Sequence, residues 1–80
     1  MELRVLKYFL AVAREESISR AAEQLHMSQP PLSRQIRELE EELGVKLFEK
    51  NGRNVTLTKY GKVFLKDVEE VLNRLDSSVN

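Results

Sequence analysis

Arginine, glutamine and serine side chains that could recognise nucleic acid lie together in residues 28–37, SQPPLSRQIR. Apolar residues recur there with a helical period: Leu32, Ile36, Leu39 and Leu43. In the predicted helix 29–43, Arg34 and Arg37 face away from this apolar stripe, and Gln29 lies at the N-terminal tip. Arginine can form two hydrogen bonds with guanine, and glutamine can form two with adenine. The outer face of this helix therefore has side chains suited to reading base edges.

The charge along this helix runs against the helix dipole. Cations occupy its first half, whereas four glutamates fill residues 38–42. The dipole favours the opposite order by about 0.3–1 kcal/mol per charge, and the expected ion pairs, Arg34–Glu38 and Arg37–Glu41, have the weaker orientation. A need for cations near the N-terminus explains the layout, because helix-turn-helix proteins insert that part of their second helix into the major groove. The alternative is a solvated face held by those ion pairs.

The charge of the whole chain is balanced, with 13 Lys and Arg residues against 13 Asp and Glu residues. Along the chain it is segregated: residues 20–37 carry a net charge of +2, residues 46–66 of +5 and residues 67–80 of −3. Binding to nucleic acid depends on a local cationic patch more than on the total charge. The blocks therefore favour a functional patch over evenly solvated surface charge.

The sequence offers little for catalysis or for metal binding. Its 80 residues include no cysteine and one histidine, His26, which excludes cysteine-zinc sites and thiol catalysis. No glycine-rich phosphate loop or nucleophile–base pairing is present. We expect no enzyme activity, no metal and no cofactor. We also expect a cytoplasmic protein, because no apolar run approaches the roughly 20 residues of a membrane span and the N-terminus is unlike a signal peptide.

Two helices are predicted before residue 28. The first ends near Glu16, because Ser17 is a good N-cap for the second, which runs from Ile18 to about residue 25. Ala22 allows the helices to cross closely, and His26 lies in the turn, where histidine tolerates a positive φ. This spacing is typical of a helix-turn-helix.

The third helix has clear signals at both ends. Ser28 is its predicted N-cap, and Pro30 and Pro31 occupy its first turn, where proline is tolerated. Gly44 follows the last apolar residue and ends the helix in the left-handed region.

A β-hairpin is predicted next, because Asn51-Gly52 lies between two apolar runs. It places Arg53 at or next to the tip and Lys50 at the base. An arginine in such a wing can contact phosphate or enter the minor groove. The alternative is a soluble turn with no ligand.

A long helix is predicted from residue 58, with Thr58 as its N-cap, to about residue 78, a length of about 30 Å. Its apolar residues are spaced nearly as in a coiled coil. Because the helix is longer than the core beside it, we expect a second copy to cover the stripe and form a homodimer. Packing against the first helix is the alternative, and both can hold, with Phe64 inward. The predicted dimer residues are Phe64, Val68, Val71, Leu72, Leu75 and Val79.

These elements predict a mainly α fold, a winged helix-turn-helix of three helices plus a β-hairpin wing, followed by a long linker helix. Residues 1–57 form the predicted DNA-binding domain, and residues 58–80 form the linker and dimerisation helix. The predicted function is sequence-specific binding to double-stranded DNA.

The run AAEQLHMSQPPLSRQI at residues 21–36, followed by LEEELG at residues 39–44, resembles the DNA-binding domain of LysR-type transcriptional regulators. The similarity continues through LFEK at residues 47–50 and reaches the long helix. One departure is Lys59, where the family often has proline after the threonine that begins the linker helix.

The resemblance implies a bacterial regulator that binds an interrupted inverted repeat as a dimer or tetramer, with its linker helix pairing subunits. The family's larger effector-binding domain does not follow Asn80, so we expect an isolated DNA-binding unit. Carried over by position, the resemblance implies that Gln29, Pro30, Ser33 and Arg34 contact bases and adjacent phosphates, that Arg53 is the wing contact, and that Ser17, Ser19 and Ser28 begin helices near phosphates. The full expected DNA-binding set is Gln29, Pro30, Pro31, Ser33, Arg34, Arg37, Arg53, Ser17, Ser19, Ser28 and Lys50.

The main alternative is a winged-helix module that binds another protein and not DNA. The balanced total charge favours this module. The segregated cations and the specific motif favour DNA.

Overall fold

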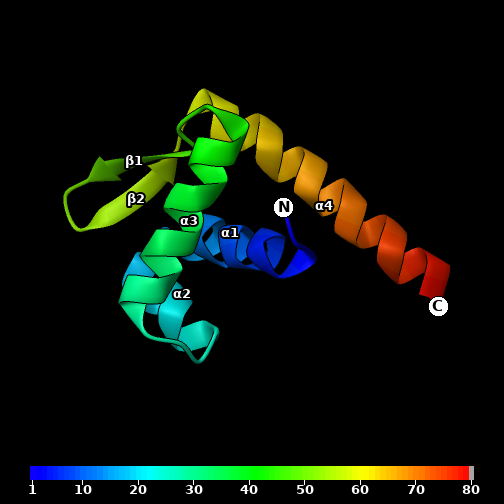
Figure 1. The fold of residues 1–80 in the computed structure, drawn as a ribbon, viewed down its shortest axis with the longest axis horizontal. Helices are drawn as coiled ribbons and strands as arrows, with labels where there is room; N and C mark the ends of the chain where they lie inside the picture. Colours follow the sequence, from blue (N-terminus) through cyan, green and yellow to red (C-terminus); the bar gives the residue numbers. More distant parts are fainter. Residues whose placement is uncertain (80) are drawn as a thin grey trace.

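The computed structural model describes residues 1–79, with side chains through residue 76, and this part of the chain forms four helices and one hairpin. The elements follow in the order α1 (Leu3–Glu15), α2 (Ile18–Gln24), α3 (Gln29–Leu43), β1 (Phe48–Asn51), β2 (Asn54–Leu57) and α4 (Lys59–Val79). In Figure 1, α3 crosses α1, the hairpin projects to one side and α4 leaves on the other. The predicted winged helix-turn-helix with a long final helix is confirmed.

The helix-turn-helix forms as its turn residues predict. Ser17 caps α2, because its Oγ accepts the N–H of Arg20 at 3.2 Å. His26 has the predicted positive φ, +55°. Ala21 and Ala22 are buried where α2 meets its neighbours, so small side chains set the close approach of the helices.

The predicted capping bond from Ser28 does not form. Ser28 occupies the N-cap position with an extended backbone, but its side chain makes no capping hydrogen bond. A capping oxygen accepts the N–H of the second or third helical residue. Those residues are Pro30 and Pro31, which have no N–H to donate. The prolines begin the helix through their fixed φ, and Ser28 remains exposed to solvent.

The core lies where α1, α3, the hairpin and α4 meet. The Phe9 ring is fully buried and packs against Phe48 and Phe64, with ring centroids 5.4 and 5.0 Å away. The apolar stripe of α3 packs into the same core. The buried core residues are Phe9, Val12, Ala21, Ala22, Leu32, Ile36, Leu39, Leu47, Val55 and Val68.

The wing is an antiparallel hairpin whose last pair is Asn51 with Asn54, so Gly52 and Arg53 form the turn. Gly52 has a φ of +68°, which glycine adopts without steric cost. Arg53 is at the tip, as predicted. Lys50 is not at the base of the hairpin. It pairs with Val55, next to the last pair before the turn. The sequence pattern located the turn but not the strand ends.

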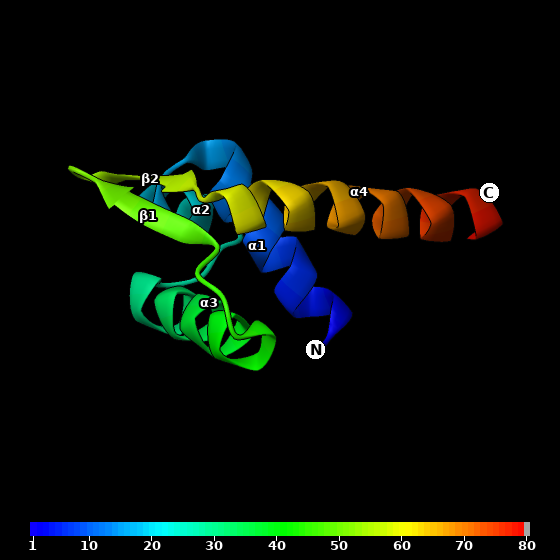
Figure 2. The ribbon, with the colours of Figure 1, turned by 90° about the horizontal axis from the view of Figure 1, so that it is seen from above.

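α4 begins where the chain leaves the hairpin. The Oγ1 of Thr58 accepts the N–H of Gly61 at 3.1 Å, which confirms the predicted N-cap, and donates to the Lys46 carbonyl at 2.6 Å. A Cβ on Gly61 would lie 2.1 Å from the Leu47 carbonyl oxygen. Figure 2 shows the end of α4 extending beyond the other elements. Within the described residues, no helix has the length and apolar character to cross a membrane.

Candidate nucleic-acid interface

The N-terminal half of α3 presents its polar residues to solvent. Arg34 and Arg37 are exposed, whereas Leu32 and Ile36 on the opposite face are buried. Gln29 and Pro30 are exposed at the tip, and Pro31 and Ser33 are half-buried. The wheel prediction for this half is therefore correct.

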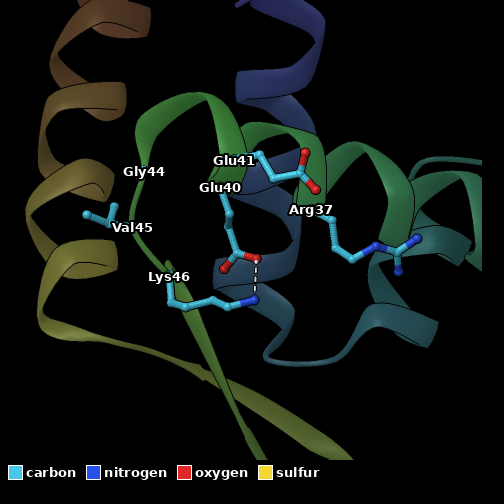
Figure 3. Close-up of a pocket in the computed structure, with 6 residues that line it drawn as sticks. All are labelled: Arg37, Glu40, Glu41, Gly44, Val45 and Lys46. Carbon is cyan, nitrogen blue, oxygen red and sulfur yellow. Dashed lines mark ion pairs between the residues drawn. The ribbon is translucent and has the colours of Figure 1, made fainter.

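The two ion pairs expected along α3 are not formed. In the described part of the chain, neither Arg34 nor Arg37 lies within ion-pair distance of a carboxylate. Figure 3 draws Arg37 and Glu41 without an ion pair between them, and its dashed line joins Glu40 to Lys46. Pairs on an exposed helix face contribute only about 0.3–0.5 kcal/mol, so the loss is small. The guanidinium groups are left available to an external anion.

A polar groove, here called the wing groove, separates the N-terminal half of α3 from the hairpin. Its helical wall brings together three of the predicted site residues, Ser19, Gln29 and Ser33, and its other wall brings together Lys50 and Arg53. Among the residues that the structure describes, no carboxylate lines the wing groove. The complete lining is Ile18, Ser19, Gln29, Ser33, Lys50, Gly52, Arg53, Asn54 and Val55. Two cations surrounded by hydroxyl and amide groups suit a phosphate backbone.

Gln29 and Ser19 bind each other across the helix-turn-helix. The Gln29 side-chain amide donates to the Ser19 Oγ. Both were predicted to face DNA, and their bond fixes the direction of the Gln29 amide, leaving its carbonyl oxygen as an acceptor. Ser17 is placed differently, because it is only 8% exposed and its Oγ is occupied by the α2 cap. Its side chain therefore acts inside the protein.

A second hollow lies at the C-terminal half of α3, lined by Arg37, Glu40, Glu41, Gly44, Val45 and Lys46 (Figure 3). Glu40 is the residue there that the sequence reasoning missed, since it was counted with the exposed acidic block. It is only 9% exposed, and its Oε1 lies 3.8 Å from the Lys46 Nζ. A signal was present, because Glu40 follows Ile36 by four residues and precedes Leu43 by three, which places it at the edge of the buried stripe.

The residues predicted for dimerisation divide into two groups. Phe64 packs against Phe9, and Val68 is only 2% exposed, so both side chains are used within the chain. Val71 and Leu75 are each 45% exposed, and Leu72 is half-buried. Val79 lies outside the residues whose side chains are described. The exposed part of the predicted seam is therefore confined to the later turns of α4.

Known bacterial regulators are similar to this chain in sequence. The curated regulator BsdA, an HTH-type transcriptional regulator of Bacillus subtilis (strain 168), is 51% identical over 80 residues, which span 99% of this chain and 28% of BsdA. The chain thus spans about a quarter to a third of the length of most of these curated relatives, and about half of the regulator BudR of Klebsiella aerogenes. These relatives are transcriptional regulators, not enzymes.

Solved structures with DNA are also similar. The crystal structure of a CbnR DBD–DNA complex has a TM-score of 0.92 and 46% identity, with 98% of this chain and 90% of that chain covered. The complex of the BenM DBD with benA site 1 DNA has a TM-score of 0.93 and 48% identity, covering 99% and 89%. Residues 3–62 match the bacterial regulatory helix-turn-helix proteins of the lysR family. The chain therefore belongs to the LysR family of bacterial helix-turn-helix regulators.

Proposed function

We propose that this domain binds double-stranded DNA in a sequence-specific manner, with the N-terminal half of α3 in the major groove and the hairpin on the adjacent backbone or minor groove. The observation that carries the proposal is the wing groove, in which hydroxyl and amide groups of the helix-turn-helix lie opposite the two cations of the wing. The two DNA complexes with similar folds support it.

The exposed residues divide between base reading and backbone binding. Arg34 is the main base-reading residue, because it is exposed and has no ion pair within the described chain. Gln29, Pro30 and Ser33 lie near base edges and neighbouring phosphates. The backbone-binding set is Ser19, Ser28, Pro31, Arg37, Lys50 and Arg53. Ser28 is exposed with no helix cap to make, which leaves its hydroxyl available to phosphate.

Ser17 has a supporting role in this scheme. Because its hydroxyl is occupied in the α2 cap, it positions the start of α2 and, through it, the exposed Ser19.

The second part of the proposal is a homodimer formed through α4, which would bind an interrupted inverted repeat. Val71 and Leu75 are exposed on the later turns of α4, and the end of this helix extends beyond the other elements (Figure 2). The charge along α4 changes from lysines in its first half to carboxylates in its second. Two antiparallel copies that overlap along the whole of α4 would place the lysines of one helix beside the carboxylates of the other, and charges flanking a helical seam select its orientation.

The oligomeric state can be measured on this chain. Sedimentation equilibrium of the wild type should give a dimer, and Val71→Glu should shift the equilibrium toward a monomer by burying an unpaired charge. A wild-type chain that stays monomeric at high micromolar concentration would rule out the α4 dimer.

In a full-length regulator, this domain would direct transcription from the promoters it binds, and tetramers could form. An effector-binding domain like that of the family would then control it. Because bacterial promoters lie in the cytoplasm, the proposed function implies a cytoplasmic location.

DNA binding can be tested without knowing the operator. A pool of random duplexes is exposed to the chain at two salt concentrations, bound members are sequenced, and their affinities are measured by fluorescence anisotropy. We expect an enriched two-fold symmetric site and a steep loss of affinity with salt, because phosphate contacts release counterions. No enrichment and no salt-sensitive binding would contradict the proposal and direct attention to a protein partner.

A further inference from the structure

The buried carboxylate of Glu40 binds the first residues of the wing. Its Oε2 accepts the N–H of Leu47 at 2.7 Å and the N–H of Phe48 at 3.3 Å. Phe48 is the first residue of β1, and Leu47 directly precedes it. A carboxylate with two such hydrogen bonds joins the body of α3 to the strand that leads to Lys50.

The other strand of the wing has an attachment of its own. The N–H of Val55 in β2 donates to the carbonyl of Glu16 at 3.1 Å, in the junction between α1 and α2. A two-stranded hairpin is at best marginally stable alone in water. The wing is therefore held by the packing of Phe48 and Val55 in the core and by these backbone hydrogen bonds, of which the Glu40 bonds come from α3.

Glu40 lies on the side of α3 that faces the wing. Gln29 and Ser33 line the wing groove, and Glu40 lies on the same side seven residues after Ser33. Figure 3 shows the Glu40 carboxylate directed toward the segment that enters β1. The distance between α3 and the strand that leads to the Arg53 tip is thus fixed by this carboxylate at the start of β1.

We propose that Glu40 is a positioning residue that holds the wing at a fixed distance from the N-terminal half of α3, so that Arg34 and Arg53 meet DNA in one register. This inference rests on the proposed function, because it assumes that both elements bind the same duplex. Glu40 itself faces the protein interior and does not contact DNA.

The variants follow from the geometry. Both hydrogen bonds go to the same oxygen, so the amide oxygen of Glu40→Gln can accept them. This variant loses the negative charge and its 3.8 Å approach to the exposed Lys46, but it keeps both acceptor contacts. Glu40→Ala removes the acceptor and leaves the buried Leu47 N–H unpaired. Glu40→Asp, one methylene shorter, is the second disrupting variant and is used if Glu40→Ala does not fold.

The decisive experiment combines each variant with Arg53→Ala and measures affinity for the selected duplex. In the wild type and in Glu40→Gln, Arg53→Ala should weaken binding by roughly tenfold near 0.1 M salt, the loss expected for one phosphate contact. In Glu40→Ala, the same change should cost less than about twofold, because the misplaced wing no longer delivers Arg53. An equal loss in all three backgrounds would overturn the positioning role, as would an Arg53→Ala change without effect in the wild type.

Spin labels give a readout that does not depend on DNA. The sequence has no cysteine, so labels at Asn54→Cys and Glu38→Cys report the distance from the wing to α3. The distance distribution should be narrow in the wild type and in Glu40→Gln, and broad in Glu40→Ala. An unchanged distribution in Glu40→Ala would contradict the inference. Failure of the wild type to bind any duplex would instead contradict the proposed function, while the label distances would still test the wing.

Discussion

The two halves of α3 have opposite relations to the rest of the molecule. Arg34 in the first half and Arg37 just past the midpoint are exposed and form no ion pair within the described chain. In the second half, Glu40 is buried against the start of β1, and Glu42 accepts a hydrogen bond from the N-terminal amine of Met1 at 2.9 Å. The first half is available for an external partner, whereas the second half holds the domain together.

This difference changes the explanation of the charge gradient along the helix. The dipole disfavours glutamates at the C-terminal end, and a need for cations at the DNA end accounts only for the other half. Glu40 is placed by the requirements of the fold, because a buried carboxylate with two N–H donors is stabilised by them. Binding and folding thus each account for part of one pattern.

The largest loss of stability is expected where the segment bound by Glu40 packs against α4. Gly61→Ala should destabilise the domain by about 3 kcal/mol, because its Cβ would lie 2.1 Å from the backbone oxygen of Leu47, the residue whose N–H binds Glu40. Urea unfolding measures the loss. The exposed neighbour Lys62→Ala is the control and should change stability by less than about 0.5 kcal/mol. Equal stabilities of the two variants would mean that this junction is loosely packed.

Arg34→Ala tests the N-terminal half of α3, which is available to an external partner. We expect a loss of about 1–3 kcal/mol in binding to the selected site, with relaxed discrimination at one base pair of each half-site. The unfolding curve should not change, because the side chain is exposed and has no ion pair in the described chain. Anisotropy titrations and urea unfolding of the same preparation separate the two effects. Unaltered affinity would show that the assigned base-reading register is wrong.

Arg53→Ala should have a smaller and less selective effect. As a backbone contact, its removal should weaken binding to most sequences similarly and reduce the salt slope by roughly 1. Titrations at several salt concentrations, on the selected site and on an unrelated duplex, measure both quantities. A loss confined to the selected site would mean instead that Arg53 reads bases.

Glu41→Gln should change stability and DNA affinity the least. It tests where along α3 the DNA contact ends. Glu41 is exposed on the same side of α3 as Arg34 and has no ion pair in the described part of the chain. We expect stability within about 0.5 kcal/mol of the wild type and DNA affinity equal to or slightly above it, because one negative charge is removed. A clear loss of affinity would place the DNA contact farther along α3 than proposed.

Local signals in the sequence predicted the element order and the outer face of α3. The apolar stripe through Leu32 and Ile36, the positive φ of His26 and the helix end at Gly44 all follow from the properties of single residues or from helical spacing. The wing turn was found for the same reason, although the strand ends differ at Lys50.

The features that were missed depend on contacts between elements. Helical spacing places Glu40 only at the edge of the buried stripe, and its burial depends on the start of β1 lying beside α3. The burial of Val68 inside the domain likewise depends on the contact between α4 and α1. The absent Ser28 cap is different, because the two prolines after Gln29 already exclude it from the sequence.

The most direct test of the central claim is a base-by-base binding profile. Wild type, Arg34→Ala and Glu41→Gln are each titrated against the selected duplex and against every single base-pair change in one half-site. We expect that Arg34→Ala loses discrimination at one position only and that Glu41→Gln keeps the wild-type profile. A profile that Arg34→Ala leaves intact, or that Glu41→Gln flattens, would contradict the assignment of DNA reading to the N-terminal half of α3.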